Sequence, residues 1–385
     1  MNNISDIKNC YGCGVCAASC GKKIIAIELN HDGFYEPRIT DENQCTHCGI
    51  CVDVCAFSHT ELANADATPI KSWAAWSNDE SIRRKCSSGG IGFQIGKQLI
   101  EQGYKAVGCR YDVNHQRAEH YIATTVEEFI ASIGSKYIQS YTVYAFRQIE
   151  RKGQKYIVTG TPCQIDSFRI MIRKFRCEDN FILLDFFCHC VPSMHAWKAY
   201  IKMLEPKIGN VTYASWRNKP TGWQDSWTMQ MNGSKGSVTS WRSKGDLFYK
   251  LFLGDVALGP QCEEQCKYKY DHSSADIRIG DLWGDTYKND QKGVSALIAF
   301  TEKGRELVEG LKDVTLIEHP FEVVAEGQMK KNAQHAKDYR YVMSHLRKPN
   351  ANLKFIEFGL KIRTMYRQVL RIIENPTKIK KILHI

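Results

Sequence analysis

The pattern of apolar and polar residues predicts most of the secondary structure of this 385-residue chain. Residues 22–39 alternate apolar and polar positions around Asp32-Gly33, which predicts a β-hairpin because Asp-Gly favours a positive-φ turn. Farther along, apolar runs of strand length alternate with runs of helical spacing, which predicts an α/β core with a largely parallel sheet. The expected strands cover 105–110, 122–124, 157–159, 181–187 and 294–300, and the expected helices cover 91–102, 126–132 and a segment that ends at 172.

Residues 211–241 have a strand-like pattern that contains four tryptophans. These rings either stack on a ligand or pack in the core, and core packing is the favoured interpretation. Beyond residue 300 the chain becomes helical and polar, so we expect an α+β arrangement overall. The four tryptophans are Trp216, Trp223, Trp227 and Trp241.

A C-terminal helix is predicted from residue 352 onward, with apolar residues on one face and basic residues opposite them. Such a helix either lies on an anionic membrane surface or a partner, or packs on its own protein with a solvated cationic face. The apolar face comprises Phe355, Phe358, Ile362, Met365, Tyr366, Val369, Leu370 and Ile373.

Composition and charge describe an ordinary globular protein of two or three domains, with 43% hydrophobic and 24% charged residues. No apolar run has the length of a transmembrane helix and no signal peptide is seen, so we expect a cytoplasmic protein, with the inner membrane surface as a site of peripheral contact. The net charge is +10, and from Met343 onward ten Lys and Arg residues oppose two Glu residues. The near-neutral remainder argues against a nucleic-acid-binding groove.

Eight of the sixteen cysteines form one pattern that occurs twice within the first sixty residues, C-x2-C-x2-C-x3-C. Thiolates at this spacing bind 4Fe–4S clusters, and the fourth cysteine of each run usually ligates the other cluster. Zinc sites more often use paired C-x2-C units, and disulfide frameworks suit short secreted chains. We therefore assign Cys10, Cys13, Cys16 and Cys55 to one cluster, and Cys45, Cys48, Cys51 and Cys20 to the other.

Five further cysteines, Cys163, Cys188, Cys190, Cys262 and Cys266, lie at predicted strand ends or in a short-spaced pair. On their own they are a weak signal, because free cysteines are common in protein cores.

Seven short motifs occur in one order and together resemble the family of coenzyme F420 hydrogenase/dehydrogenase beta subunits, with a dicluster ferredoxin fused in front. The resemblance covers about residues 1–310. The motifs are Cys86-Ser-Ser-Gly-Gly90, Gly134-Ser-Lys-Tyr137, Gly160-Thr-Pro-Cys-Gln164, Cys188-His-Cys-Val-Pro-Ser193, Cys262 with Cys266, Asp276-Ile-Arg-Ile-Gly-Asp-Leu-Trp-Gly284 and Gly293-Val-Ser295.

This resemblance implies FAD and a third 4Fe–4S cluster in the core. The cysteines at the family's cluster positions are Cys163, Cys188, Cys262 and Cys266, with Cys190 as the alternative to Cys188. Glycine-rich turns before helices can bring backbone N–H groups to a phosphate, although each is also compatible with an ordinary turn or helix cap. With the resemblance, the candidate FAD residues are Ser88, Gly89, Gly90, Ser135, Lys136, Gly160 and Thr161.

Four regions are expected: a dicluster ferredoxin domain at 1–60, the two parts of the family core at 61–150 and 151–320, and a basic helical tail at 321–385. The predicted function is an iron–sulfur flavoprotein oxidoreductase. It would relay electrons between a ferredoxin-type partner or coenzyme F420 and a small substrate at FAD. The resemblance also links it to polysaccharide biosynthesis. The alternative is a non-catalytic electron-transfer subunit that docks on a larger redox enzyme.

Overall fold

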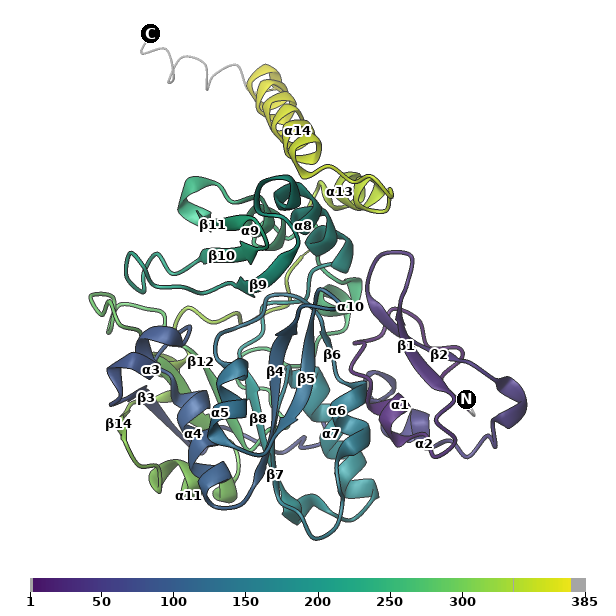
Figure 1. Cartoon of the computed structure of the whole chain (residues 1–385), viewed down its shortest axis with the longest axis vertical. Coiled ribbons are helices and arrows are strands. Elements are labelled where there is room, and N and C mark those ends of the chain that lie inside the picture. Colours follow the sequence, from purple (N-terminus) through teal and green to yellow (C-terminus); the bar gives the residue numbers. More distant parts are fainter. Residues whose placement is uncertain (1–2, 335, 375–385) are drawn as a thin grey trace.

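The computed structural model describes residues 3–334 and 336–374. Figure 1 shows a small N-terminal module beside a large sheet, a second small sheet above it, and a helix that projects from the far end. Residues 375–385, where the basic tail was predicted to continue, lie outside the described residues.

The N-terminal module is built on the predicted hairpin, in which β1 (Ile25–Leu29) pairs antiparallel with β2 (Tyr35–Ile39). Gly33 has a φ of 78°, so the Asp-Gly prediction for the turn is confirmed. Short helices follow the cysteine loops. They are α1 (Val15–Ser19), η1 (Glu42–Gln44), α2 (Ile50–Asp53) and η2 (Ala56–Ser58).

A nine-stranded mixed sheet forms the centre of the molecule, in the order β14-β3-β13-β12-β8-β7-β4-β5-β6. The middle strands β12, β8, β7 and β4 are parallel, whereas antiparallel pairs flank them on both sides. The α/β expectation is confirmed, but the sheet is mixed and not largely parallel, because four of its eight strand pairings are antiparallel. The strands are β3 (Lys71–Ser77), β4 (Lys105–Asp112), β5 (Arg117–Ala123), β6 (Ser140–Tyr141), β7 (Tyr156–Thr159), β8 (Phe181–Phe186), β12 (Ile277–Asp281), β13 (Ser295–Ala299) and β14 (Val314–Glu318).

Helices cover both faces of this sheet, which explains why the sequence of β8 is an almost unbroken apolar run. Ile182 and Leu184 pack with α4 on one face, while Phe181 and Leu183 pack with α7 on the other. The helices around the sheet are α3 (Glu80–Lys85), α4 (Ile91–Glu101), α5 (Val126–Phe129), η3 (Ile130–Ser132), α6 (Val143–Gln148), α7 (Pro162–Lys174), η4 (Glu178–Asn180), α11 (Glu302–Glu309) and α12 (Phe321–Val324).

A three-stranded antiparallel sheet, ordered β11-β10-β9, packs with α8 and α9 in a separate core. The strand-like pattern of 211–241 is thus confirmed. Trp216 and Trp223 are buried, as core packing predicted, whereas Trp227 lines a cavity described below. The elements are β9 (Val211–Ser215), β10 (Thr228–Gly233), β11 (Gly236–Trp241), α8 (Met194–Ile208), η5 (Arg242–Lys244), α9 (Leu247–Phe252) and α10 (Pro260–Glu264).

Two helices end the described chain, α13 (Tyr339–Leu346) and α14 (Leu353–Glu374). Leu353 and Ile356 of α14 are buried against the core that contains α8 and α9. None of the helices among the described residues is long and apolar enough to cross a membrane.

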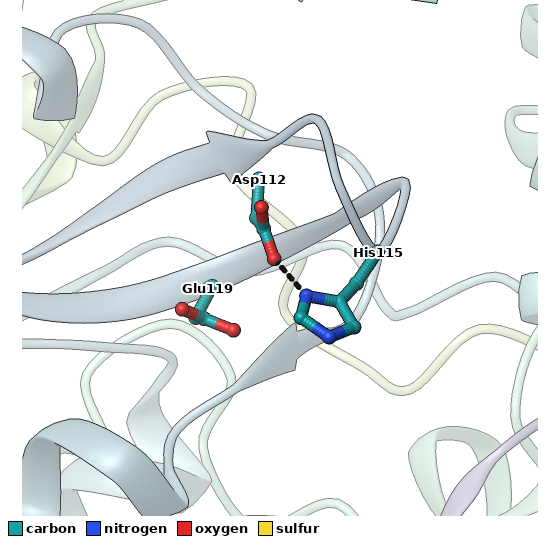
Figure 2. Close-up of side chains that lie close together, drawn as sticks. All are labelled: Asp112, His115 and Glu119. Atoms are coloured by element: carbon teal, nitrogen blue, oxygen red, sulfur yellow. Dashed lines mark hydrogen bonds and ion pairs between the residues drawn. The ribbon is translucent and has the colours of Figure 1, made fainter.

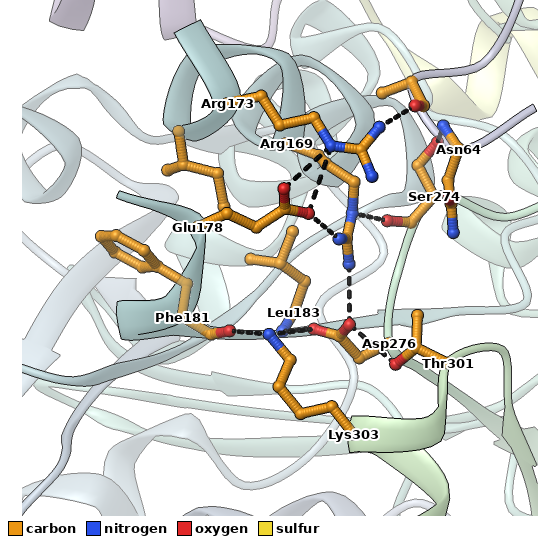
Figure 3. Close-up of polar contacts among 12 residues, drawn as sticks. Asn64, Arg169, Arg173, Glu178, Phe181, Leu183, Ser274, Asp276, Thr301 and Lys303 are labelled. Atoms are coloured by element: carbon orange, nitrogen blue, oxygen red, sulfur yellow. Dashed lines mark hydrogen bonds and ion pairs between the residues drawn. The ribbon is translucent and has the colours of Figure 1, made fainter. Parts of the chain in front are cut away.

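Buried ion pairs join the layers of the core. Figure 3 shows Arg169 of α7 reaching Asp276, which comes just before β12, at 2.9 Å. Asp276 also accepts hydrogen bonds from the Leu183 amide and the Thr301 hydroxyl. A second pair, Arg278 of β12 with Asp185 of β8, has both side chains fully buried. Charges buried this deeply require partners, so these pairs fix the positions of α7, β8 and β12.

The N-terminal module is bonded to the core over a broad surface, and α1 packs on α6 and α7 (Figure 1). Lys267 of the core donates to the carbonyls of Ala56, His59 and Glu61 at 2.8–3.1 Å. Thr142 donates to the Cys13 carbonyl at 2.7 Å. The module is therefore held in one orientation on the core.

Candidate functional site

The two cysteine repeats have the same backbone turns. Gly14 and Gly49 occupy equivalent positions, both with φ of 75°, and each directly precedes a short helix. Gly12 and His47 are also equivalent, with φ of 64° and 51°. Left-handed residues between the cysteines curl each run into a loop, which turns its thiols toward one centre.

One cavity brings together Cys10, Cys13, Cys16 and Cys55, which is the first cross-ligated set predicted from the sequence. Burial raises the pKa of the Cys13 thiol to about 11, and nearby Cys55 contributes to the same shift. Burial disfavours the thiolate forms of Cys10, Cys13 and Cys16 and so raises the pKa of each, and repulsion between neighbouring thiolates adds to this effect. A cationic metal centre would supply the charge that lets them ionise.

The sulfur spacing favours a multi-iron cluster over a single zinc ion. In a tetrahedral zinc site with Zn–S bonds of about 2.3 Å, the sulfurs lie about 3.8 Å apart. Across the described residues, no three cysteine sulfurs lie within 4.8 Å of one another. The cysteine sets therefore suit a larger group.

The second predicted set lies at the outer side of the module. Cys51 is buried, Cys20 and Cys45 are half-buried, and Cys48 is exposed. Asn3 donates from its side-chain amide to the Cys45 sulfur at 3.7 Å. A cluster in this set would be the one that a redox partner in solution reaches first.

A second cavity is lined by the five cysteines that the sequence singled out in the core, and these come from three separate segments. Lys269 is buried beside them and donates to the carbonyls of Cys188 and His189 at 2.8 and 2.6 Å. Burial lowers the pKa of Lys269, but the neighbouring thiolates outweigh it and the pKa is raised. No pattern in the sequence pointed to this lysine. The cysteines are Cys163, Cys188, Cys190, Cys262 and Cys266.

A third and much larger cavity, of about 400 Å³, adjoins the second. This volume is typical of sites for sizeable organic ligands. Of the candidate FAD residues, Ser88, Gly90, Ser135, Lys136, Gly160 and Thr161 line it. Gly89 lies behind the wall, where its amide donates to the Ser295 hydroxyl and an added Cβ would come within 2.3 Å of the Ala75 carbonyl.

The two turns at the mouth of this cavity are bonded to each other. The Ser135 amide donates to the Ser87 hydroxyl at 2.8 Å. Lys219, which is buried behind the first turn, donates to the Ser88 carbonyl at 2.6 Å. The 86–90 turn then leads into α4 through Gly90, whose φ is 88°. The start of this helix thus faces the cavity and favours a negatively charged group there.

Lys136 lies in the cavity wall, and its ammonium donates to the carbonyls of Ala131, Ser132 and Ile133 at 2.9–3.3 Å. Burial lowers its pKa to about 8. The side chain therefore braces the turn after η3 and also carries a charge at the cavity when protonated.

Gly160 and Thr161 join the second cavity to the third, because Thr161 lines both. Thr161 caps α7 through a capping box with Gln164. Its hydroxyl lies 3.2 Å from the Cys163 sulfur. The helix cap thus fixes a predicted cluster ligand beside the large cavity.

Another wall of the large cavity is organised by Arg217, a residue that the sequence did not single out. Arg217 is fully buried and forks onto Asp281 with contacts of 2.8 and 3.0 Å. Its guanidinium also lies over the rings of Trp227 and Trp283, at 4.7 and 5.1 Å from their centroids. Asp281 and both rings line the cavity, so this pair holds an aromatic surface in place.

His189 also lines the large cavity, with Nε2 at 2.8 Å from the Asp255 carboxylate and Nδ1 at 3.1 Å from the Met329 sulfur. Burial lowers the pKa of His189. The ring is thus held by partners on both sides.

Outside these cavities, Asp112, His115 and Glu119 place ligand atoms within 4.8 Å of one another on the β4–β5 hairpin (Figure 2). Glu119, however, already accepts hydrogen bonds from Arg117 at 2.5 and 3.2 Å. Because a guanidinium already neutralises this carboxylate, we do not assign a metal to the group.

Comparison with protein families agrees with this geometry. The model for the N-terminal part of the coenzyme F420 hydrogenase/dehydrogenase beta subunit matches residues 72–146, and that for its C-terminal part matches residues 153–321. Together they span well over half of the chain. The chain belongs to this family. A 4Fe–4S dicluster domain model matches residues 9–58, in front of this beta-subunit core.

Known proteins that are similar to this chain include the following two. One component of the F(420)H(2) dehydrogenase of Methanosarcina mazei is 25% identical over 344 residues, which cover 85% of this chain and 91% of the relative. A chain of the F420-reducing NiFe hydrogenase complex from Methanosarcina barkeri, solved as a xenon derivative, is 16% identical with a TM-score of 0.44; the match covers 78% of this chain and 94% of that one. This chain thus combines the core of an oxidoreductase family with a 4Fe–4S dicluster domain, a combination that suits electron transfer.

Proposed function

We propose that this chain is an iron–sulfur flavoprotein oxidoreductase with three 4Fe–4S clusters and FAD. The observation that carries the proposal is that the three cavities lie next to one another in space, the first beside the second and the second beside the third. Tyr11 and Gly12 line both the first and the second cavity, while Thr161 and Cys188 line both the second and the third. Such an arrangement suits stepwise electron transfer from the outer module to a ligand in the large cavity.

The walls of the large cavity carry groups whose chemistry suits FAD. The 86–90 and 134–136 turns would face the diphosphate, and Lys136 would add a cation. Trp227 and Trp283, held by Arg217, offer ring surfaces for the apolar parts of the cofactor. When bound, flavin exchanges single electrons with clusters and electron pairs with an organic substrate.

The protein's own residues would position these carriers and exclude water between them. Tyr11 separates the first two cavities, with its hydroxyl donating to the Gln265 carbonyl at 2.5 Å. Its ring packs edge-on against Phe57 and Tyr268, with centroids 5.1 and 5.6 Å away. Lys269 would offset the negative charge of the third cluster's thiolates.

The exposed Cys48 end of the module supports entry or exit of electrons through a redox protein partner. The same observation also favours the second candidate, a subunit that passes electrons to a larger enzyme. Turnover of a soluble substrate by the isolated chain would separate the two. A cytoplasmic location is supported by the sixteen free cysteines, which suit a reducing compartment. Use of coenzyme F420 and the link to polysaccharide synthesis stay predictions from the resemblance.

Anaerobic purification with iron, sulfide and flavin analysis tests the proposal. We expect about twelve iron atoms per chain, because three four-iron clusters require that number, together with one FAD. About eight iron atoms would contradict the core cluster, and a chain without flavin would contradict the enzyme assignment.

Flavin affinity is expected to fall as the pH rises above about 8, the pKa of Lys136 without ligand. A bound anion favours the charged lysine, so binding takes up a proton and weakens by up to about tenfold per pH unit once the lysine is neutral. Fluorescence titration of flavin-stripped protein from about pH 7 to about pH 9.5 brackets that pKa and measures this slope. The Lys136→Met variant should bind flavin more weakly, and its flavin affinity should no longer depend on pH in this range. If the pH dependence were unchanged in the variant, a group other than Lys136 would be responsible for it.

A further inference from the structure

Helix α14 is held by one face. Besides the buried Leu353 and Ile356, Leu360 packs on the core that contains α8 and α9. Arg363 and Arg367 both pair with Asp338 at 2.6 Å. These contacts fix which side of the helix points outward.

The outward side is an apolar stripe that we call the outer stripe. Its six side chains are between 50% and 64% exposed, although each is large and apolar. They recur at helical spacing, so they form one continuous face about 21 Å long at about 1.5 Å per residue. The outer stripe comprises Phe355, Phe358, Ile362, Met365, Tyr366 and Val369.

Figure 1 shows α14 projecting from the end of the molecule, beyond the β9–β11 sheet and away from the large sheet, so a broad flat surface can approach the helix. Exposed apolar patches of this extent mark sites of interaction. The inner face is apolar at Leu353, Ile356 and Leu360 and basic at Arg363 and Arg367, so the predicted basic face opposite the apolar stripe is present in the later turns only.

Two lysines lie along one edge of the outer stripe. At about 100° per residue, Lys354 and Lys361 fall beside one edge, where Lys361 also pairs with Glu357 of the same helix at 3.2 Å. A helix whose exposed aromatic and aliphatic residues lie beside lysines matches the interfacial class, which lies in the plane of an anionic bilayer. The cations then meet lipid phosphates while the apolar side chains enter the acyl boundary.

We propose that α14 docks this protein on an anionic lipid surface through the outer stripe. A second copy of the chain fits the stripe less well. If two stripes packed together, Lys354 and Lys361 of one copy would face the other edge of the partner's stripe, which carries Gly359 and Tyr366 and no acidic residue. The proposal is independent of the cofactors, and it places the electron-transfer chain at the membrane surface.

Co-sedimentation of the full, anaerobically purified chain with vesicles tests this. Vesicles of phosphatidylcholine with about 30% phosphatidylglycerol, a composition on the order of natural anionic surfaces, are compared with pure phosphatidylcholine. Binding to the anionic vesicles should be at least about tenfold tighter and should weaken with added salt. The double variant Phe358→Ser/Met365→Ser should weaken it by at least about tenfold, because two large apolar side chains are no longer buried.

The matched control is Tyr213→Ser, which removes a similarly exposed ring on β9 and should leave binding unchanged. Iron content and circular dichroism check that each variant folds. Equal binding of the Phe358→Ser/Met365→Ser variant and the wild type would overturn the proposal. So would a dimer in sedimentation velocity that this double variant dissociates, since the stripe would then belong to a second copy.

Discussion

The Cys163→Ser variant is expected to retain the two N-terminal clusters and to lose electron flow between them and the large cavity. Cys163 lies in the cavity between them, with its sulfur next to the Thr161 hydroxyl that also lines the large cavity. Losing the intermediate carrier should lower the iron content from about twelve to about eight atoms. After dithionite reduces the N-terminal clusters, electron transfer from them to the flavin should slow by about a hundredfold or more. This corresponds to a rise of about 2.7 kcal/mol in the activation free energy.

Stopped-flow absorbance follows flavin reduction, and electron paramagnetic resonance of the frozen protein counts the reduced clusters. The control is Cys177→Ser, a buried cysteine after α7 whose sulfur contacts only the Ile172 carbonyl among the polar contacts of the described residues. It should keep full iron and rate. A Cys163→Ser protein with full iron and an unchanged rate would contradict the relay. Comparing Cys188→Ser with Cys190→Ser then decides which of the two is the ligand.

The second large effect is expected on stability. Arg278→Met would leave the Asp185 carboxylate fully buried without its guanidinium partner. An uncompensated buried charge costs about 3–5 kcal/mol of unfolding free energy, which is a large share of the total stability of a domain. Arg278 also donates to the carbonyls of Tyr270 and His272, so the segment that carries Cys266 and Lys269 should loosen as well.

Urea unfolding followed by circular dichroism measures the loss. The matched control is Arg38→Met, which breaks an ion pair with Glu28 whose side chains are both at least half exposed. Surface pairs contribute little to the unfolding free energy because solvent and salt screen their charges, so this variant should lose far less stability than Arg278→Met. Equal losses for the two variants would show that burial does not set the contribution of Arg278.

Local patterns in the sequence account for the parts of the site that were predicted. The cysteine spacing encodes the loops around Gly14 and Gly49, because two intervening residues with a left-handed glycine suffice to close the turn. The cap of α7 is equally local, since Thr161 and Gln164 are three residues apart. Continuous apolar runs predicted β8 because both of its faces are covered.

The missed parts depend on contacts between distant residues. Strand β12 contains a buried arginine, Arg278, and a charged residue argues against a buried strand when the sequence is read locally. The partner that makes its burial possible is Asp185, which lies 93 residues away in the sequence. Arg217 and Asp281 are 64 residues apart, and neither carries a local signal of pairing. Strand β3 was missed because small residues such as Ala74 and Ala75 give weak alternation.

The bonds that Lys267 and Thr142 make to the N-terminal module have a kinetic consequence. In relay systems whose carriers sit on separate proteins, each transfer waits for a collision and therefore slows on dilution. Here the module is part of the same chain and is bonded to the core, so the step from module to core is intramolecular. Its rate should stay constant however scarce the protein becomes in the cell, and only the encounter with the outside partner should follow mass action.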